Sequence, residues 1–262
     1  MAGAELSPDG ARVVGADRVL AVLIELGDHP QGATLDELSL AMKSPKSTVH
    51  RALTSLRRAG LATLVSRGTY ALGDEFFRVA FRNFADRPDA LRITPVLEEL
   101  TRRYGETAHY AVLDGADVVY RAKTDPPGGA VRLTSVIGGR NPAYRTAVGK
   151  LLLSYRITSE RELRGLVGEG PLQSRTQHTI TDVGALWREL QVSAERGYAV
   201  DDQENEVGVN CLAVPVRLDQ SGPPAGAVSV SALAFRLPLA DLVAEAPAIA
   251  AVVRGESVAD LQ

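Results

Sequence analysis

The sequence predicts an α+β protein of two domains, a small one at the N-terminus followed by a larger mixed one. Three observations support this prediction. The chain has 262 residues, whereas single domains usually span about 100 to 200. The first 73 residues show three helical periodicities and then a short hairpin pattern. From residue 94 onward, strand-like and helical runs are mixed, which is typical of an α+β domain.

The composition excludes several classes of protein. The net charge of -3 gives no global electrostatic argument for nucleic-acid binding. The single Cys211 cannot form an internal disulfide or a cysteine-rich zinc site, and the histidines, His178 included, form no metal-ligand pattern. No apolar run approaches the roughly 20 residues of a membrane span, and the first 18 residues lack a signal-peptide pattern. We expect a cytoplasmic protein with no cofactor, no metal and no membrane partner.

The N-terminal region predicts a mobile arm and two helices. Residues 1–16 lack periodicity and mix Gly, Pro, Asp and Ala, so we expect a mobile arm. Asp17 fits the N-cap of a first helix that ends at Gly27. Thr34 and Glu37 have the spacing of a capping box, in which each side chain binds the other residue's free backbone N–H, and they predict the start of a second helix.

The stretch "SPKSTVHRALTSLRRAG", residues 44–60, predicts a third helix with a basic outer face. Ser44 fits its N-cap, Pro45 its first position and Gly60 its end. The apolar positions recur with the period of a helix and define the buried stripe: Val49, Ala52, Leu53 and Leu56. After this helix, "LATLVSRGTYALG" predicts two short strands with Arg67 at the tip of their hairpin. Three helices and a basic-tipped hairpin make a winged helix-turn-helix over residues 17–73.

The charge pattern of this domain indicates DNA binding. No acidic residue lies between Glu37 and Asp74, but six Lys and Arg residues do. A solvated basic face is the alternative, and the absence of any acid favours DNA. Residues near the N-terminus of a recognition helix reach base edges, so the candidates for base readout are Ser47, Thr48, His50 and Arg51. The candidates for phosphate contacts are Ser44 and Lys46 at the helix N-terminus, with Arg57, Arg58 and Arg67.

Residues 74–93 predict a linker helix with an aromatic stripe of Phe76, Phe77, Phe81 and Phe84. The stripe fits packing against its own domain or contact with a second subunit, and the sequence leaves both open. A new helix is expected from Thr94–Pro95 to Tyr104. Beyond it, strands are expected at 107–113, 117–123, 130–136, 211–218 and 225–235, and helices at 147–155, 162–167, 182–197 and near the C-terminus.

Three segments of the larger domain carry polar residues that are candidates for binding or catalysis. "RNPAYRTAVGK" fails as a phosphate loop, because Tyr144 stands where that loop needs Gly and Leu151 where it needs Ser or Thr. Instead, Thr146 fits the N-cap of a helix whose free N–H groups can receive a carboxylate, although isolated caps are more often structural. Ser229 and Ser231 alternate along a strand, so both hydroxyls face the same side. The acidic loop around Asp201 lacks calcium-loop spacing.

The chain resembles the IclR family of bacterial transcriptional regulators over nearly its whole length. The resemblance is carried by the helix-turn-helix and by "GETAHYAVLDGADVVY", "GGRNPAYRTAVGKLLLSY" and "ERGYAVDDQENEVGVNCLAVPV". It implies a GAF-like effector-binding domain over residues 94–262 and a homodimer or dimer of dimers on a double-stranded, partly palindromic operator. The loop "VSRGTY" is short beside the family's usual wing. The candidate effector-binding residues are Arg140, Tyr144, Thr146, Ala147, Gly149, Asp201, Glu204, Cys211, Ser229 and Ser231.

The sequence and this resemblance together predict a DNA-binding regulator controlled by a small metabolite, which we expect to be an organic acid. Two rival hypotheses remain. In the first, the winged helix binds a protein partner rather than DNA. In the second, Cys211 is a nucleophile with His109 or His178 as its base, and the chain is an enzyme. No motif supports an enzyme, and we expect none.

Overall fold

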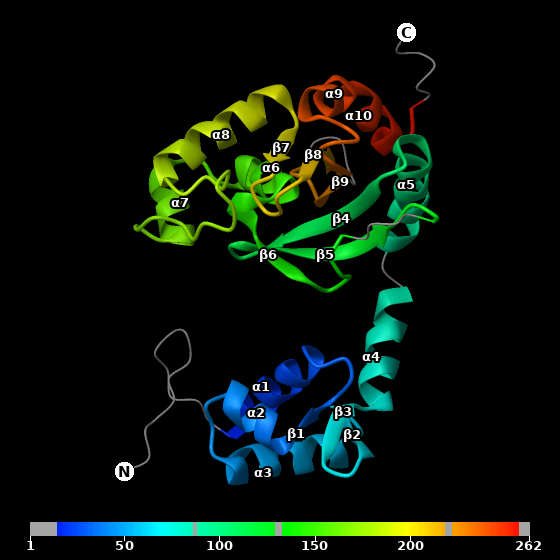
Figure 1. Cartoon of the computed structure of the whole chain (residues 1–262), viewed down its shortest axis with the longest axis vertical. Coiled ribbons are helices and arrows are strands. Elements are labelled where there is room, and N and C mark those ends of the chain that lie inside the picture. The colour runs from blue at the N-terminus through cyan, green and yellow to red at the C-terminus, as the bar shows by residue number, and fades with distance from the viewer. Residues whose placement is uncertain (1–14, 86–87, 129–132, 218–221, 257–262) are drawn as a thin grey trace. The chain divides into compact units, whose positions relative to one another are not determined.

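The computed structural model describes residues 15–85, 88–128, 133–217 and 222–256. The chain divides into two compact units at residues 87 and 88, and each is considered by itself. Figure 1 shows the helical N-terminal unit and the mixed C-terminal unit. Among the described residues, no helix combines the length and the apolar character that a membrane crossing requires.

The N-terminal unit is the expected winged helix. Its elements are α1 (Gly15–Gly27), β1 (Ala33–Thr34), α2 (Leu35–Ala41), α3 (Lys46–Arg58), β2 (Ala62–Ser66) and β3 (Thr69–Leu72). The predicted stripe of α3 is buried and packs with Val22 and Leu26 of α1 and with Leu38 of α2. The hairpin tip at Arg67 is exposed, and Gly68 completes the turn with a φ of 85°.

Local details of this unit confirm one cap and correct two others. In the capping box, the Glu37 N–H donates to Thr34 Oγ1 at 3.2 Å, and the Thr34 N–H donates to Glu37 Oε2 at 2.7 Å. The N-cap prediction for Asp17 was wrong, because α1 begins at Gly15 and Asp17 lies in its first turn. The prediction for Ser44 was wrong too, since α3 begins at Lys46 with Pro45 as N-cap. Pro45 lies outside the helix with a ψ of 137°, so Ser44 belongs to the preceding turn.

The short strand β1 was not predicted. It pairs antiparallel with β3, Ala33 opposite Tyr70 and Thr34 opposite Thr69, and makes the hairpin a three-stranded sheet. Two residues are too few to show a period of two, so the sequence pattern carries no signal for this strand.

The helices that follow differ from the predicted boundaries. The first, α4, spans Asp74–Ala85, and α5 spans Pro88–Tyr104, so the second helix begins six residues before the expected Thr94. Pro88 is tolerated because the N–H groups of a first turn have no helical partner, and Pro95 is accommodated inside the helix. Phe77 and Phe81 of α4 stack with ring centroids 6.0 Å apart and are 42% and 67% exposed. The side chain of Phe84 and the predicted arm up to residue 14 lie outside the described parts.

The C-terminal unit is built on an antiparallel six-stranded sheet with the order β6-β5-β4-β9-β8-β7. Its strands are β4 (Thr107–Asp114), β5 (Asp117–Thr124), β6 (Arg140–Pro142), β7 (Ala199–Asp202), β8 (Val209–Val216) and β9 (Gly226–Leu233). Four of them were predicted, and the short β6 and β7 were not. The strand expected at 130–136 was wrong in its described part, because Leu133–Val136 form a loop.

Helices cover the two faces of this sheet (Figure 1). On one face lie α6 (Ala147–Arg156), α7 (Glu160–Val167) and α8 (Val183–Arg196). On the other lie α5, α9 (Leu239–Ala244) and α10 (Ala246–Arg254). Alternation along each strand divides its side chains between the two cores, so that Ala108, Tyr110 and Val112 of β4 face α5 while Ala111 faces α6.

Helix α6 lies close to the sheet because the side chains between them are small. Ala111, Ala213 and Ala227 lie on the covered face of three neighbouring strands. At its N-terminus, Thr146 is the predicted N-cap and accepts a hydrogen bond from the Gly149 N–H at 3.1 Å. Gly149 packs directly against the backbone of Ala143 in the preceding 3₁₀ turn, η1 (Ala143–Arg145). This contact fixes where α6 begins.

We predict opposite effects of Gly→Ala changes in two helices. A Cβ at Gly149 would overlap the backbone of Ala143, so Gly149→Ala is expected to lower the free energy of unfolding by about 1–3 kcal/mol through overpacking. Gly165 of α7 has open space around the Cβ position, and Gly165→Ala is expected to raise it by roughly 0.5–1 kcal/mol. Urea unfolding monitored by circular dichroism measures both, and a stability unchanged by Gly149→Ala would contradict the close contact.

Candidate functional site

The outer face of α3 presents most of the predicted DNA-contacting residues. Lys46, Ser47, His50 and Arg51 are exposed near its N-terminus, and Thr48 is half-buried. The predicted phosphate contacts Arg57, Arg58 and Arg67 are exposed as well. Ser44 is the exception, because it is buried in the turn between α2 and α3, where its N–H donates to the Ser39 carbonyl at 3.0 Å. It therefore does not belong to this face.

One acidic side chain lies near the N-terminus of α3. Asp36 forms an ion pair with Lys46, Oδ1 to Nζ at 2.8 Å, and both side chains are more than 60% exposed. Exposed ion pairs of this kind contribute little to stability, so Lys46 can exchange Asp36 for a phosphate at small cost. The other predicted cations of this domain are exposed: Arg51, Arg57, Arg58 and Arg67.

A polar row crosses four strands of the C-terminal sheet just beyond the N-terminus of α6. His109 of β4 pairs in register with Ser229 of β9, Ser231 with Cys211 of β8, and Cys211 with Asp201 of β7. Alternation places all five side chains on the face that α6 covers elsewhere. Because α6 begins at Ala147, it leaves this row uncovered. A cavity of about 50 Å³ lies against the row.

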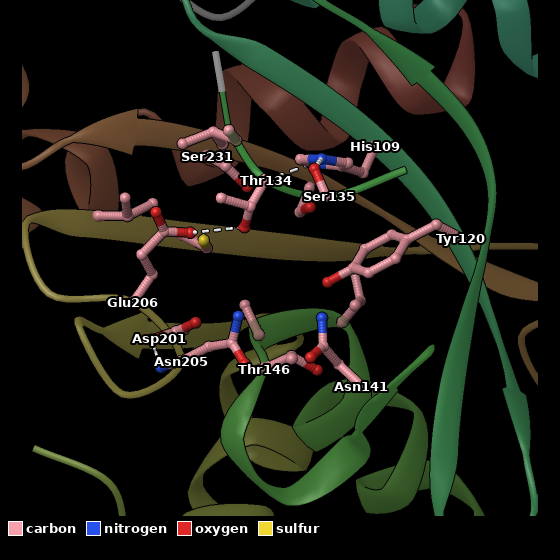
Figure 2. A pocket seen from close by; sticks show the side chains of 16 residues that line it. His109, Tyr120, Thr134, Ser135, Asn141, Thr146, Asp201, Asn205, Glu206 and Ser231 are labelled. Carbon is pink, nitrogen blue, oxygen red and sulfur yellow. Dashed lines mark hydrogen bonds between the residues drawn. The ribbon is translucent and has the colours of Figure 1, made fainter. Parts of the chain in front are cut away.

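Three further elements close the cavity (Figure 2). Tyr120 of β5 stands at one side, with its ring centroid 5.1 Å from that of His109. The segment around Thr134 and Ser135 forms the roof, where Ser135 Oγ lies 2.7 Å from His109 Nε2. Thr134 donates to Glu206 Oε2 at 3.3 Å and so joins the roof to the loop that follows β7. The first turn of α6, at Thr146, forms the floor.

Six of the ten predicted effector-binding residues line this cavity: Thr146, Ala147, Asp201, Cys211, Ser229 and Ser231. The other four do not. Tyr144 is buried in the core, with its hydroxyl donating to the Gln173 carbonyl, and Gly149 packs on η1. Glu204 is buried in an ion pair with Lys150, and Arg140 pairs with Asp114 at the sheet edge. Each of these four residues has a structural partner inside the domain.

Two asparagines of the cavity wall were not predicted from the sequence. Asn141 and Asn205 both line the cavity, and their Oδ1 atoms accept hydrogen bonds from the guanidinium of Arg145, at 3.2 and 2.9 Å. Arg145 therefore fixes the direction of both amides, and their NH₂ groups are turned away from it toward the hollow (Figure 2). No local pattern indicates this for Asn205, because it meets Arg145 only when the loop after β7 folds back on η1.

His109, Tyr120 and Glu206 were also missed as lining residues. Alternation along β4 and β5 could have placed His109 and Tyr120 on one face of the sheet. It could not have indicated which face carries a cavity. The position of Glu206 depends on the loop fold, in which the backbone N–H groups of Glu204 and Asn205 donate to Asp201 Oδ1 at 2.7 and 3.4 Å.

Burial governs the charge of the cavity. It raises the pKa of Asp201 to about 7, helped by the neighbouring Glu204 carboxylate and opposed by Lys150. It lowers the pKa of His109 to about 3, with the Lys123 ammonium acting in the same direction, so His109 is neutral. Asp201 is therefore the group of the polar row whose charge changes near neutral pH.

The same environment disfavours the enzyme hypothesis. A catalytic thiol needs a lowered pKa and a basic imidazole beside it. Burial and the Asp201 carboxylate instead raise the pKa of the Cys211 thiol well above its usual value, while burial lowers that of His109. His178 lies in an exposed loop and does not line the cavity. The thiol of Cys211 is therefore not activated as a nucleophile.

Comparison with known proteins identifies the class of the chain. The family model described as the IclR helix-turn-helix domain matches residues 15–66, and the model described as the bacterial transcriptional regulator IclR C-terminal domain matches residues 90–256. The chain therefore belongs to the IclR family of DNA-binding transcriptional regulators, whose C-terminal domain is the effector domain.

Individual relatives agree over most of the chain. The HTH-type transcriptional regulator KdgR of Escherichia coli (strain K12) is 33% identical over 233 residues, 88% of this chain and 86% of that protein. The Pca regulon regulatory protein of Pseudomonas putida is 30% identical over 225 residues, 86% of this chain and 76% of that protein. The crystal structure of an IclR transcriptional regulator from Alicyclobacillus acidocaldarius matches with a TM-score of 0.77 and 26% identity, covering 94% of this chain and 99% of that one.

We predict that Asp201 makes the stability of the protein depend on pH. The folded-state pKa near 7 lies above the ordinary value of 3.8, so the folded protein keeps a proton that the unfolded chain loses. The contribution of Asp201 is then most favourable below about pH 4 and is lost as the pH rises through 7. An asparagine at this position cannot ionise. The unfolding free energy of Asp201→Asn, measured in urea, should therefore increase relative to that of wild type between pH 4 and 7, and the difference should stay constant above pH 7.

Comparing wild type with Asp201→Asn isolates the contribution of Asp201 to stability. The contribution of His109 is opposite, because it is more favourable at higher pH, but it is present in both proteins. Parallel pH profiles for wild type and Asp201→Asn would show that Asp201 has an ordinary pKa.

Proposed function

We propose that α3 reads an operator through Ser47, Thr48, His50 and Arg51, and that a small organic acid bound in the cavity at the N-terminus of α6 controls this binding. The observation that carries the proposal is the uncovered polar row in the IclR-type C-terminal domain, enclosed by the first turn of a helix.

The donors around the cavity favour a carboxylate. Thr146 caps the Gly149 N–H, and Ala147 and Val148 line the cavity at the positive end of the helix dipole. The amides of Asn141 and Asn205 add NH₂ donors on the same side. Among the described residues no Lys or Arg side chain lines the cavity, so the acid is bound by neutral donors and by Asp201 in its protonated form.

Control of DNA binding is proposed to act through a dimer. Two recognition helices on a partly palindromic operator must meet half-sites about 34–36 Å apart, so a change in subunit placement changes affinity. The exposed Phe77 and Phe81 of α4, which stack on one face of the helix, support a contact with a second subunit. Exposed aromatic side chains in one patch are typical of such contacts.

We predict that Arg51→Ala weakens specific DNA binding by about tenfold or more, in line with the loss of one base contact. Fluorescence anisotropy with the DNA upstream of the gene that encodes the chain, against a scrambled duplex, measures it across a salt series. Arg188→Ala, which removes an exposed cation from α8, is the control and should bind like wild type. If Arg51→Ala lost affinity equally for both duplexes, Arg51 would be a phosphate contact. If the wild-type protein showed no salt-dependent binding to any operator from a genome-wide selection, the protein-partner hypothesis would be favoured.

We also predict how the affinity for the acid depends on pH. Binding a carboxylate beside Asp201 favours its neutral form, so the affinity for a small acid such as propionate should fall as the pH rises from 6 to 8. In Asp201→Asn the affinity should be nearly independent of pH over this range. Isothermal titration calorimetry at constant ionic strength measures both proteins, and also the proton taken up from the buffer. Affinity that rises with pH would exclude a carboxylate next to Asp201.

A further inference from the structure

A second, outer chamber of about 180 Å³ adjoins the cavity. The two chambers share the wall residues Tyr120, Thr134, Ser135, Asn141, Asn205 and Glu206. Figure 2 shows these side chains around the inner hollow, with Glu206 and Thr134 on one side and Tyr120 and Asn141 on the other. The outer chamber adds Arg140 and Arg175, two cations that the inner one lacks.

The volume of the inner chamber limits what it can hold. About 50 Å³ corresponds to roughly three to five water molecules at about 10–15 Å³ each. A carboxylate with one or two carbons has a similar number of non-hydrogen atoms. A longer acid bound by the first turn of α6 must therefore extend past the shared wall into the outer chamber.

The two arginines of the outer chamber differ in how they are paired. The Arg140 guanidinium is paired with Asp114 and lies 3.7 Å from Asp117 Oδ2, so its charge is offset at the sheet edge. No acidic side chain within the described part of the chain forms an ion pair with Arg175. Glu206 also lines the outer chamber, but its carboxylate accepts a hydrogen bond from Thr134 and forms no ion pair with Arg175 in the described part of the chain. Arg175 is thus the cation that can meet a ligand without losing a partner.

The backbone of Arg175 is held in place relative to the cavity. Its N–H donates to Thr179 Oγ1 at 3.1 Å, and the Thr179 hydroxyl donates to the Glu204 carbonyl at 2.7 Å. Thr176 makes a second link, its hydroxyl donating to the Gln203 carbonyl at 2.7 Å. The loop that carries Arg175 is therefore attached to the residues directly before Asn205 and Glu206 of the shared wall. The backbone that carries the guanidinium is therefore ordered before a ligand binds, which lowers the entropic cost of binding.

We propose, resting on the proposed function, that the outer chamber is a second ligand subsite in which Arg175 binds an anionic group at the far end of the effector. The effector class is then a linear aliphatic dicarboxylate, with one carboxylate at the first turn of α6 and the other at Arg175. Arg175 acts as a specificity-determining residue, since a guanidinium can hold a carboxylate through two parallel hydrogen bonds.

The test compares acids of equal chain length that differ in one carboxylate: butyrate with succinate, valerate with glutarate, and hexanoate with adipate. Affinities of the full-length protein are measured by isothermal titration calorimetry at constant pH and ionic strength. In wild type, the diacid of at least one pair should bind about tenfold or more tightly than its monoacid. Arg175→Ala should bring this ratio close to one while leaving monoacid affinity unchanged, and Arg175→Lys should keep part of it.

Arg161→Ala is the matched control, because it removes an exposed cation from α7 that lines neither chamber. It should retain the wild-type ratio, and thermal unfolding should show that each variant is folded. If both series bind and the ratio is the same in wild type and Arg175→Ala, the outer subsite is refuted while an acid-binding cavity stands. If none of these acids, nor propionate, binds wild type, the organic-acid hypothesis itself fails, and the dicarboxylate assignment with it.

Discussion

The close approach of helix α6 to the sheet is the constraint on which the C-terminal domain depends. The alanines at positions 111, 213 and 227 allow the helix to lie near the strands, and Gly149 allows its first turn to rest on the backbone of Ala143. Together these contacts fix where the helix begins. The next row of the sheet cannot be covered by α6, and it carries polar rather than apolar side chains. The cavity is thus a consequence of where a well-packed helix starts.

The loops that close the cavity are held by buried polar contacts. Lys150 of α6 and Glu204 form an ion pair in which both side chains are almost fully buried. Removing one partner of such a pair leaves an uncompensated buried charge, which is strongly destabilising. The pair therefore ties the loop after β7 to α6. On the opposite side, the Lys123 ammonium donates to the Leu133 and Ser135 carbonyls at 3.1 and 2.9 Å and holds the roof. Both walls are anchored to regular elements rather than to each other alone.

Residue patterns predicted the elements that have a period or a cap. The stripe of α3, the capping box at Thr34 and the N-cap at Thr146 each leave a signal within a few residues, and the structure has all three. Boundaries that depend on proline were less predictable, because Pro88 and Pro95 lie at the start and inside one helix instead of ending another. Strands of two to four residues, such as β1, β6 and β7, are shorter than any pattern that can identify them.

The candidate site was predictable to the extent that its residues lie on regular elements. Thr146, Asp201, Cys211 and the two serines line the cavity as expected. The structure did not confirm Glu204 and Tyr144 as lining residues, because a side chain's direction in a loop or a 3₁₀ turn depends on its tertiary partners. Arg145 shows the same limit, since it acts on the cavity through two asparagines that only the fold brings to it.

One strand connects the cavity with the helix that leads to the DNA-binding unit. His109 of β4 faces the cavity, while its neighbours Ala108 and Tyr110 face the opposite core, where Leu97 and Leu100 of α5 pack. The Tyr110 ring fills the space that Gly226 leaves open, so it has little room to move. Because packed interiors are not continuously deformable, a displacement of β4 on ligand binding must be met by α5. In the sequence, α5 follows α4 after two residues, so β4 and α5 link the cavity to the segment of the chain that leads into the N-terminal unit.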